Sequence, residues 1–90
     1  MKTLAEKQFI ASTVYHHGQR TGEFVTLLAY KDKRDGSYEL WDNREGDDDY
    51  LCGTEAYIFD EWGTRNRQLV EDGFRLDNMR GENKWQRFIT

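Results

Sequence analysis

The densest group of side chains that could do chemistry in this chain is acidic and lies in its middle third. Residues 39–62 contain nine acidic side chains and a single basic one, Arg44. Carboxylates this close together repel one another unless positive charge meets them. The pattern therefore predicts a surface for a basic partner, and a solvated loop leading into a helix is the alternative. The predicted contact residues are Glu45, Asp47, Asp48, Asp49, Tyr50, Asp60 and Glu61.

These carboxylates do not follow the order of a calcium-binding loop. An EF-hand alternates its ligands along the loop and places a glycine sixth. Counted from Asp42, the glycine comes fifth, as Gly46, and Arg44 occupies the third position, where a ligand is needed. We therefore expect no metal site. We also expect no cofactor, because the glycines stand singly and none has the spacing of a nucleotide-binding turn.

Two histidines and one cysteine are the remaining candidates for catalysis. His16 and His17 are adjacent in an expected strand, so their side chains point to opposite faces and cannot share one small metal ion. Cys52 has no base beside it in the sequence and is interpreted as a small buried hydrophobic residue. We expect the protein not to be an enzyme. A small hydrolase that uses His16 or His17 with a carboxylate is kept as an alternative.

A second alternative is a module that binds single-stranded nucleic acid, because basic and aromatic residues are interleaved in the C-terminal third. Aromatic side chains between cations on a sheet can stack bases, and Phe74, Trp85 and Phe88 are the candidates here. The acidic block would oppose a phosphate chain, so direct contact with nucleic acid is the less favoured reading. The cations of this secondary surface are Arg65, Arg67, Arg75, Arg80 and Lys84.

Three strands are expected to position these residues in the first half of the chain. β-branched and aromatic residues predict strands over 8–16, 23–30 and 37–42, and the second of these is apolar on both faces, as central strands are. Asp35-Gly36 is typical of a tight type I′ turn, which would set Tyr30 opposite Trp41. A four-residue loop would shift this register. Residues 43–49 have no apolar side chain and predict a solvated connection.

One helix and two further strands are expected to complete the fold. Thr54 is a plausible N-cap, and apolar residues at spacings of three, four and seven predict a helix over 54–72 that Gly73 ends. Gly63 leaves open a strand to residue 62 followed by a shorter helix. Segments 74–79 and 84–89 predict a closing hairpin. The expected class is α+β, an antiparallel sheet in the order βββαββ with a single helix packed on one face.

Composition limits the class of protein. A chain of 90 residues accommodates one domain, 1–90, with a modest core carried by aromatic side chains. Its net charge of −4 argues against unspecific attraction to nucleic acid or anionic membrane. The single cysteine, the lack of an apolar signal segment and the lack of a long apolar run predict a cytoplasmic protein that spans no membrane. We expect a monomer or a small homo-oligomer.

In size, acidity and layout the chain resembles the small phage-encoded inhibitors of host machinery, including anti-CRISPR proteins. It is acidic, aromatic-rich and free of proline, and the charge of 45–49 lies next to a lone predicted helix. These inhibitors share general features rather than sequence, so no residue role is carried over. The basic C-terminal third departs from those inhibitors that mimic DNA throughout. The resemblance implies a partner class: a larger, basic, nucleic-acid-handling protein or ribonucleoprotein complex, bound and inhibited in the host cytoplasm.

Overall fold

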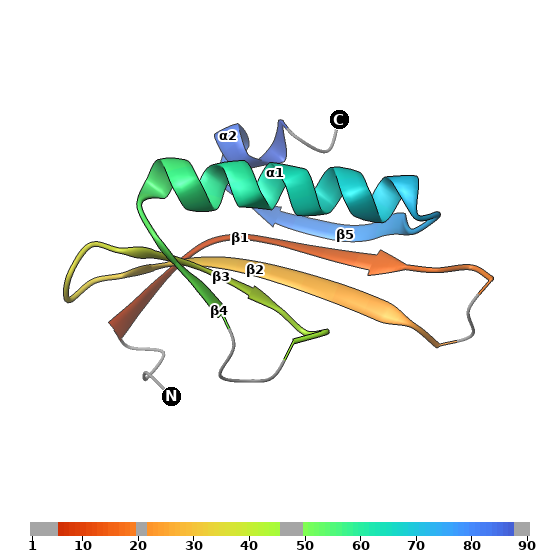
Figure 1. The fold of residues 1–90 in the computed structure, drawn as a ribbon, viewed down its shortest axis with the longest axis horizontal. Coiled ribbons are helices and arrows are strands. Elements are labelled where there is room, and N and C mark those ends of the chain that lie inside the picture. The colour runs from red at the N-terminus through yellow and green to blue at the C-terminus, as the bar shows by residue number, and fades with distance from the viewer. Residues whose placement is uncertain (1–5, 20–21, 46–49, 88–90) are drawn as a thin grey trace.

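The chain forms a five-stranded antiparallel sheet with one long helix packed against one face, which confirms the predicted α+β class (Figure 1). The computed structural model describes residues 6–19, 22–45 and 50–87. The strands are β1 (Lys7–His16), β2 (Phe24–Asp32), β3 (Tyr38–Asp42), β4 (Tyr50–Gly53) and β5 (Arg75–Gly81). Their order across the sheet is β4-β3-β2-β1-β5. The strand with apolar residues on both faces, β2, is therefore central, as its pattern predicts.

The connection between β2 and β3 is a four-residue loop, and the predicted type I′ turn is wrong. The amide of Asp32 donates to the carbonyl of Ser37 at 2.8 Å, which closes the loop over 33–36. Gly36 has a positive φ of 74° but Asp35 does not, whereas a type I′ turn needs two such residues. Tyr30 consequently lies opposite Glu39 rather than Trp41.

The number of strands matches the prediction, but one strand lies elsewhere in the chain. Residues 50–53 form β4, which pairs with β3 at the edge of the sheet where only a connection was expected. The predicted closing strand over 84–89 is wrong, because Asn83–Gln86 is the short helix α2 and residues 88–90 lie outside the described part. β5 pairs with β1 instead and forms the other edge.

The long helix α1 (Glu55–Glu71) is continuous, as the preferred interpretation of this segment predicts. The Thr54 side chain caps its start by accepting from the amide of Tyr57 at 3.2 Å. Gly73, with φ of 94°, follows its end, and the amide of Phe74 donates back to the carbonyl of Leu69 at 2.9 Å. Neither helix in the described ranges has both the length and the apolarity to cross a membrane.

The core lies between α1 and the sheet. Trp62 is fully buried there, and its indole nitrogen donates to the backbone carbonyl of Trp85 in α2 at 3.0 Å. The burial of Trp85 against α1 explains why residues 83–86 turn into a helix despite their strand-like composition. The other buried apolar residues are Ile10, Ala11, Tyr15, Val25, Leu27, Ala29, Leu40, Ile58, Leu69 and Phe74.

The amide of Asn66 is a buried polar group in this core and ties α1 to β1. Its oxygen accepts from the Tyr15 hydroxyl at 2.6 Å and from the Thr13 hydroxyl at 2.9 Å. Its nitrogen donates to the carbonyl of Trp62 at 2.6 Å, so the buried amide is satisfied at both ends. Burial raises the pKa of the Tyr15 phenol to about 12.

Candidate functional site

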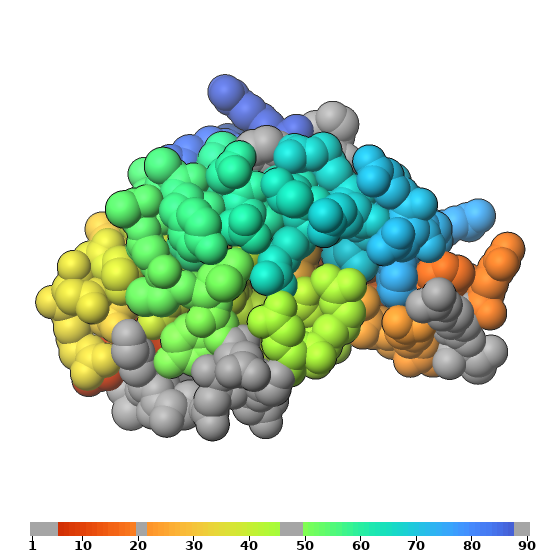
Figure 2. Space-filling model, viewed as in Figure 1, coloured from red at the N-terminus to blue at the C-terminus, as the bar shows by residue number. Residues whose placement is uncertain are grey.

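Two of the predicted acidic contact residues meet at one arginine of α1. Arg65 Nη1 donates to Glu45 Oε1 at 2.7 Å, and Arg65 Nε lies 3.8 Å from Glu61 Oε2, one helical turn away. Asp60 is exposed beside Glu61. Figure 2 shows the turn after β3 packed against the middle of α1. We call Glu45, Asp60 and Glu61 the acidic patch. Asp47, Asp48 and Asp49, which follow Glu45 in the sequence, lie outside the described residues.

Beneath the acidic patch a buried carboxylate anchors two arginines. Asp42, at the end of β3, accepts from Arg44 Nη2 at 2.6 Å and from Arg65 Nη1 at 3.1 Å. Burial, the largest single influence, raises the pKa of Asp42. The hydrogen bonds and charge of Arg44 and the charge of Arg65 outweigh it, so that the pKa lies below its usual value. This carboxylate is thus held charged and fixes the geometry of the patch.

The charges around the patch leave it acidic. Two guanidinium groups, those of Arg44 and Arg65, stand beside the carboxylates of Asp42, Glu45 and Glu61, and Asp60 adds one more. Arg65 was predicted to belong to a separate basic surface, whereas it is part of the acidic one. The spacing of Glu61 and Arg65, four residues apart in a helix, is the signal that could have placed it there.

Tyr50 does not belong to this patch. It pairs with Trp41 and lies on the face of the sheet opposite α1, where its ring centroid is 4.8 Å from Lys7 Nζ. Tyr57, in contrast, is 46% exposed on α1, one turn before Asp60 and Glu61. The aromatic side chain that accompanies the carboxylates is therefore Tyr57.

The predicted basic and aromatic hairpin does not exist as a surface. Phe74 and Trp85 are buried in the core, so neither can stack a base, and Phe88 lies outside the described residues. The five cations are also dispersed. Arg65 belongs to the acidic patch, Lys84 pairs with Glu55 at 2.8 Å, Arg67 lies 3.5 Å from Thr64 Oγ1, and Arg75 and Arg80 belong to β5.

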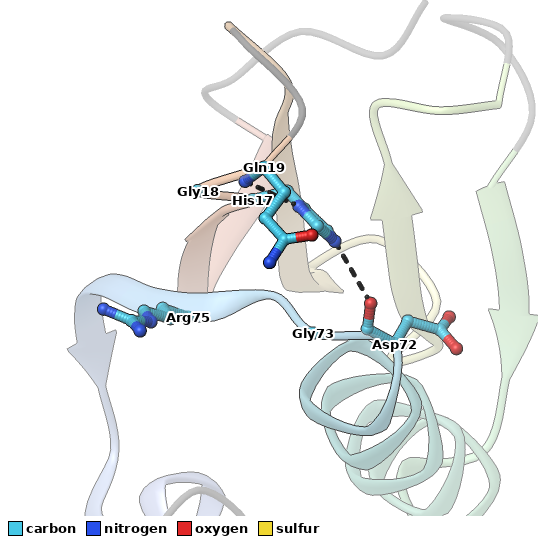
Figure 3. A pocket seen from close by; sticks show the side chains of 6 residues that line it. All are labelled: His17, Gly18, Gln19, Asp72, Gly73 and Arg75. Carbon is cyan, nitrogen blue, oxygen red and sulfur yellow. Dashed lines mark hydrogen bonds between the residues drawn. The ribbon is translucent and has the colours of Figure 1, made fainter.

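The histidine alternative has its own small pocket, at the end of α1 (Figure 3). His17 Nδ1 accepts from the amide of Gln19 at 3.2 Å, so Nε2 carries the proton and donates to the carbonyl of Asp72 at 3.2 Å. The carboxylate of Asp72 points away from the imidazole (Figure 3). His17 therefore binds the last turn of α1 rather than a carboxylate that could assist hydrolysis. His16 packs on Phe24, with ring centroids 4.7 Å apart.

Metal binding finds no support in the described ranges. Among residues 6–19, 22–45 and 50–87, no three His, Cys, Asp or Glu side chains are grouped so that they could hold an ion. Cys52 is a free, exposed thiol on the edge strand β4. It pairs with Glu39 in the register of β3 and β4, and its exposure shows that the expected burial of this residue is wrong.

Sequence reasoning missed the face of the sheet that neither helix covers. We call it the open face. Phe9 and Phe24 are 41% and 48% exposed there, although residues 23–30 were expected to form a central strand with apolar residues on both faces. Alternation within the strands and the pairing register place Tyr30, Trp41 and Tyr50 on the same face. β1 alternates between buried and less buried residues only from Ala11 to His16, because a bulge interrupts it between Phe9 and Ala11, so its sequence pattern carries little signal of this face.

Compared with protein-family models, with curated proteins and with solved structures, the chain gave no match in any of the three searches.

Proposed function

We propose that this chain is a small non-enzymatic interaction protein that binds a larger, basic, nucleic-acid-handling protein or complex in the cytoplasm and inhibits it. The contact surface is the acidic patch, extended by Asp47, Asp48 and Asp49. The observation that carries the proposal is the convergence of Glu45 and Glu61 on Arg65, because it brings carboxylates from two separate segments to one place.

The arrangement of the patch suits recognition of a cationic surface. Asp42 holds Arg44 and Arg65 from below, so the outer carboxylates are fixed in position before a partner arrives. Preorganised charge reduces the ordering cost of binding and accelerates association by long-range attraction. The exposed ring of Tyr57, one turn away, offers the kind of aromatic anchor that dominates binding energy in protein interfaces.

Inhibition follows from competition for the same cations. A surface that binds nucleic acid uses Lys and Arg to neutralise phosphates. Carboxylates bound to those cations exclude the phosphate chain. The inhibitor therefore does not need to catalyse any reaction; it needs only to occupy the basic surface with sufficient affinity.

The test begins with affinity capture from nuclease-treated host lysate, followed by surface-plasmon kinetics with the purified partner at low and high salt. We expect the Asp47→Asn/Asp48→Asn/Asp49→Asn and Asp60→Asn/Glu61→Gln variants to associate more slowly than the native protein. The difference should shrink as salt is raised, because charge steering is screened beyond about 8 Å at physiological ionic strength. The native protein should also displace nucleic acid from the partner.

A control matched to the Asp60→Asn/Glu61→Gln variant removes two charges elsewhere. Asp77→Asn/Glu82→Gln neutralises two exposed carboxylates, one on β5 and one immediately before α2. It should associate at the native rate if the acidic patch is the contact. Equal association rates for all variants at both salt concentrations would contradict the proposal, as would a captured partner that retains its nucleic acid in a saturated complex.

A further inference from the structure

We propose that the open face is a stacking platform for single-stranded nucleic acid, separate from the acidic patch. It combines exposed aromatic rings with two arginines that form no salt bridge within the described residues, on one face of an antiparallel sheet. Base–aromatic stacking tolerates any sequence, and cations beside the rings neutralise phosphates. This inference does not depend on the function proposed above.

The rings follow the pairing register in rows across the sheet. Phe9 of β1 lies beside Tyr30 of β2, Leu28 lies beside Trp41, and His16 lies beside Phe24 at the far end of the same two strands. From Phe9 to His16 the strand covers roughly 23 Å at about 3.3 Å per residue. Exposed rings therefore stand at both ends of a path that is long enough for a few nucleotides.

Two arginines of β5 flank this path. Arg80 pairs with Ser12 and places its guanidinium 5.4 Å from the Phe9 ring centroid, so a cation and a ring face the same ligand. Arg75 pairs with His16 at the other end. Within the described ranges neither arginine forms a salt bridge with a carboxylate.

Two carboxylates of the open face, those of Glu39 and Asp32, are already bound. Glu39 lies 3.1 Å from Lys7 Nζ, and that ammonium also lies 5.1 Å from the centroid of the Tyr30 ring. Asp32 accepts from the amide of Arg34 at 2.9 Å. The acidic patch lies on the helix side, with the sheet between it and the open face. At physiological salt its repulsion of a phosphate chain is screened over such a distance.

A second copy of this chain is the competing occupant of an apolar sheet face. The charges favour the nucleic acid, because its phosphates would neutralise Arg75 and Arg80, whereas a second copy would bring two more cations to the same interface. Single-stranded DNA and RNA offer the same chemistry of bases and phosphates. Both are therefore included as probes.

The experiment measures fluorescence anisotropy of labelled dT12, rU12 and a 12-base-pair duplex at low salt. We expect both single strands to bind more tightly than the duplex. Phe9→Ala and Phe24→Ala should each weaken single-strand binding about 5- to 100-fold, from the stacking lost per base. Arg80→Gln should reduce the slope of log affinity against log salt concentration by about 0.7 in magnitude, the value for one phosphate contact on a single strand.

Two controls and one spectroscopic signal make the outcome specific. Tyr57→Ala removes an aromatic ring exposed to a similar extent on the other side of the molecule, and Asp60→Asn/Glu61→Gln removes charge from the acidic patch. Both should leave oligonucleotide affinity within about twofold of native. Trp41 is partly exposed, whereas Trp62 and Trp85 are buried. Stacking of a base should therefore quench the part of the fluorescence that Trp41→Phe removes.

Three results would overturn the inference. One is that neither dT12 nor rU12 binds the native protein, although the native protein and its variants melt at the same temperature. Another is equal affinity for the duplex, because paired bases cannot splay onto the rings. The third is a native dimer in analytical ultracentrifugation that Phe9→Ala or Phe24→Ala converts to a monomer without any oligonucleotide binding.

Discussion

The indole nitrogen of Trp62 donates to the backbone carbonyl of Trp85 at 3.0 Å, and the two rings meet edge to face with centroids 5.7 Å apart. This contact joins the middle of α1 to α2. Both side chains are fully buried, so the pair fills one end of the core with two aromatic rings. The indole nitrogen of Trp62 has its hydrogen-bond acceptor there.

Truncation of the core should unfold a large part of the population. Leu27→Ala or Trp62→Ala should each lower the free energy of unfolding by roughly 2–5 kcal/mol, since both side chains are fully buried. Total stability for a domain of this size is about 5–10 kcal/mol. Phe24→Ala on the open face is the control and should cost much less. Urea unfolding followed by tryptophan fluorescence distinguishes these outcomes; equal losses in all three variants would contradict the assignment of the core.

The buried phenol of Tyr15 should make the fold sensitive to alkali. Its pKa is raised to about 12 in the folded state against about 10 in the unfolded chain. The stability that it contributes is present below pH 10 and is lost as the pH rises toward 12. Tyr15→Phe should lower the free energy of unfolding by about 0.5–1.5 kcal/mol at neutral pH, because it removes the hydrogen bond to Asn66. The variant should also lose less stability than the native protein as the pH rises toward 12.

Denaturant titrations between pH 8 and pH 12 measure this effect. Tyr57→Phe, at an exposed ring, is the control and should keep the native alkaline slope. If Tyr15→Phe loses stability with pH as steeply as the native chain, the phenol is not the responsible group.

Asp42 should contribute to acid unfolding. Its pKa is lowered from an ordinary value of 3.8, so the stability that it provides is present above that value and is lost as the pH falls through the folded pKa. Asp42→Asn should cost roughly 1–3 kcal/mol at neutral pH, because Arg44 and Arg65 lose a shared acceptor. The variant should also show a shallower loss of stability below pH 4 than the exposed-site variant Asp60→Asn, measured by urea titration at successive pH values.

Glycine at position 81 should be irreplaceable. Its φ is 134°, and a Cβ built there would come within 2.5 Å of Ala11 Cα, because β5 passes close to the backbone of β1 at this point. Gly81→Ala should therefore destabilise the protein by more than about 1–3 kcal/mol, the usual cost of strained backbone. At Gly18 a Cβ meets nothing within 4 Å, so Gly18→Ala should be nearly neutral in a thermal melt. A native melting temperature for Gly81→Ala would show that β5 does not approach β1 in this way.

Calcium and zinc should leave the melting temperature unchanged after dialysis against chelator. A specific site at 100 times its dissociation constant would add about 2.7 kcal/mol to stability. A reproducible rise in melting temperature on titration with either ion would establish a site that the described residues do not contain.

The parts of the fold with local signals were predictable from the sequence. α1 begins after Thr54 and ends before Gly73, as the cap preferences of these residues predict. The apolar content of β2 identified it as the central strand. β4 was missed because a four-residue strand beside a polar connection has too little pattern of its own. Trp85 was assigned to a strand by its intrinsic propensity, which tertiary burial against Trp62 overrides.

The candidate site was predictable in composition but not in arrangement. The acidic charge of the middle third was evident, yet only the packing of the turn after β3 on α1 brings Glu45 to Arg65. Phe24 illustrates the second difficulty. Apolar residues on both faces of a strand do not tell which face a single helix will cover, so its exposure depends on tertiary structure.

The strand order has a consequence for the nascent chain on the ribosome. β1 is made first among the strands, yet its outer edge is paired only by β5, where Ala11 meets Gly81 across nearly the whole described chain. Pairing between strands so far apart in the sequence loses loop-closure entropy before any stabilising contact forms. Until residue 81 has left the exit tunnel, β1 presents an unpaired backbone edge next to apolar side chains. During synthesis this edge is the natural place for a chaperone to bind, and for two unfinished chains to pair with each other.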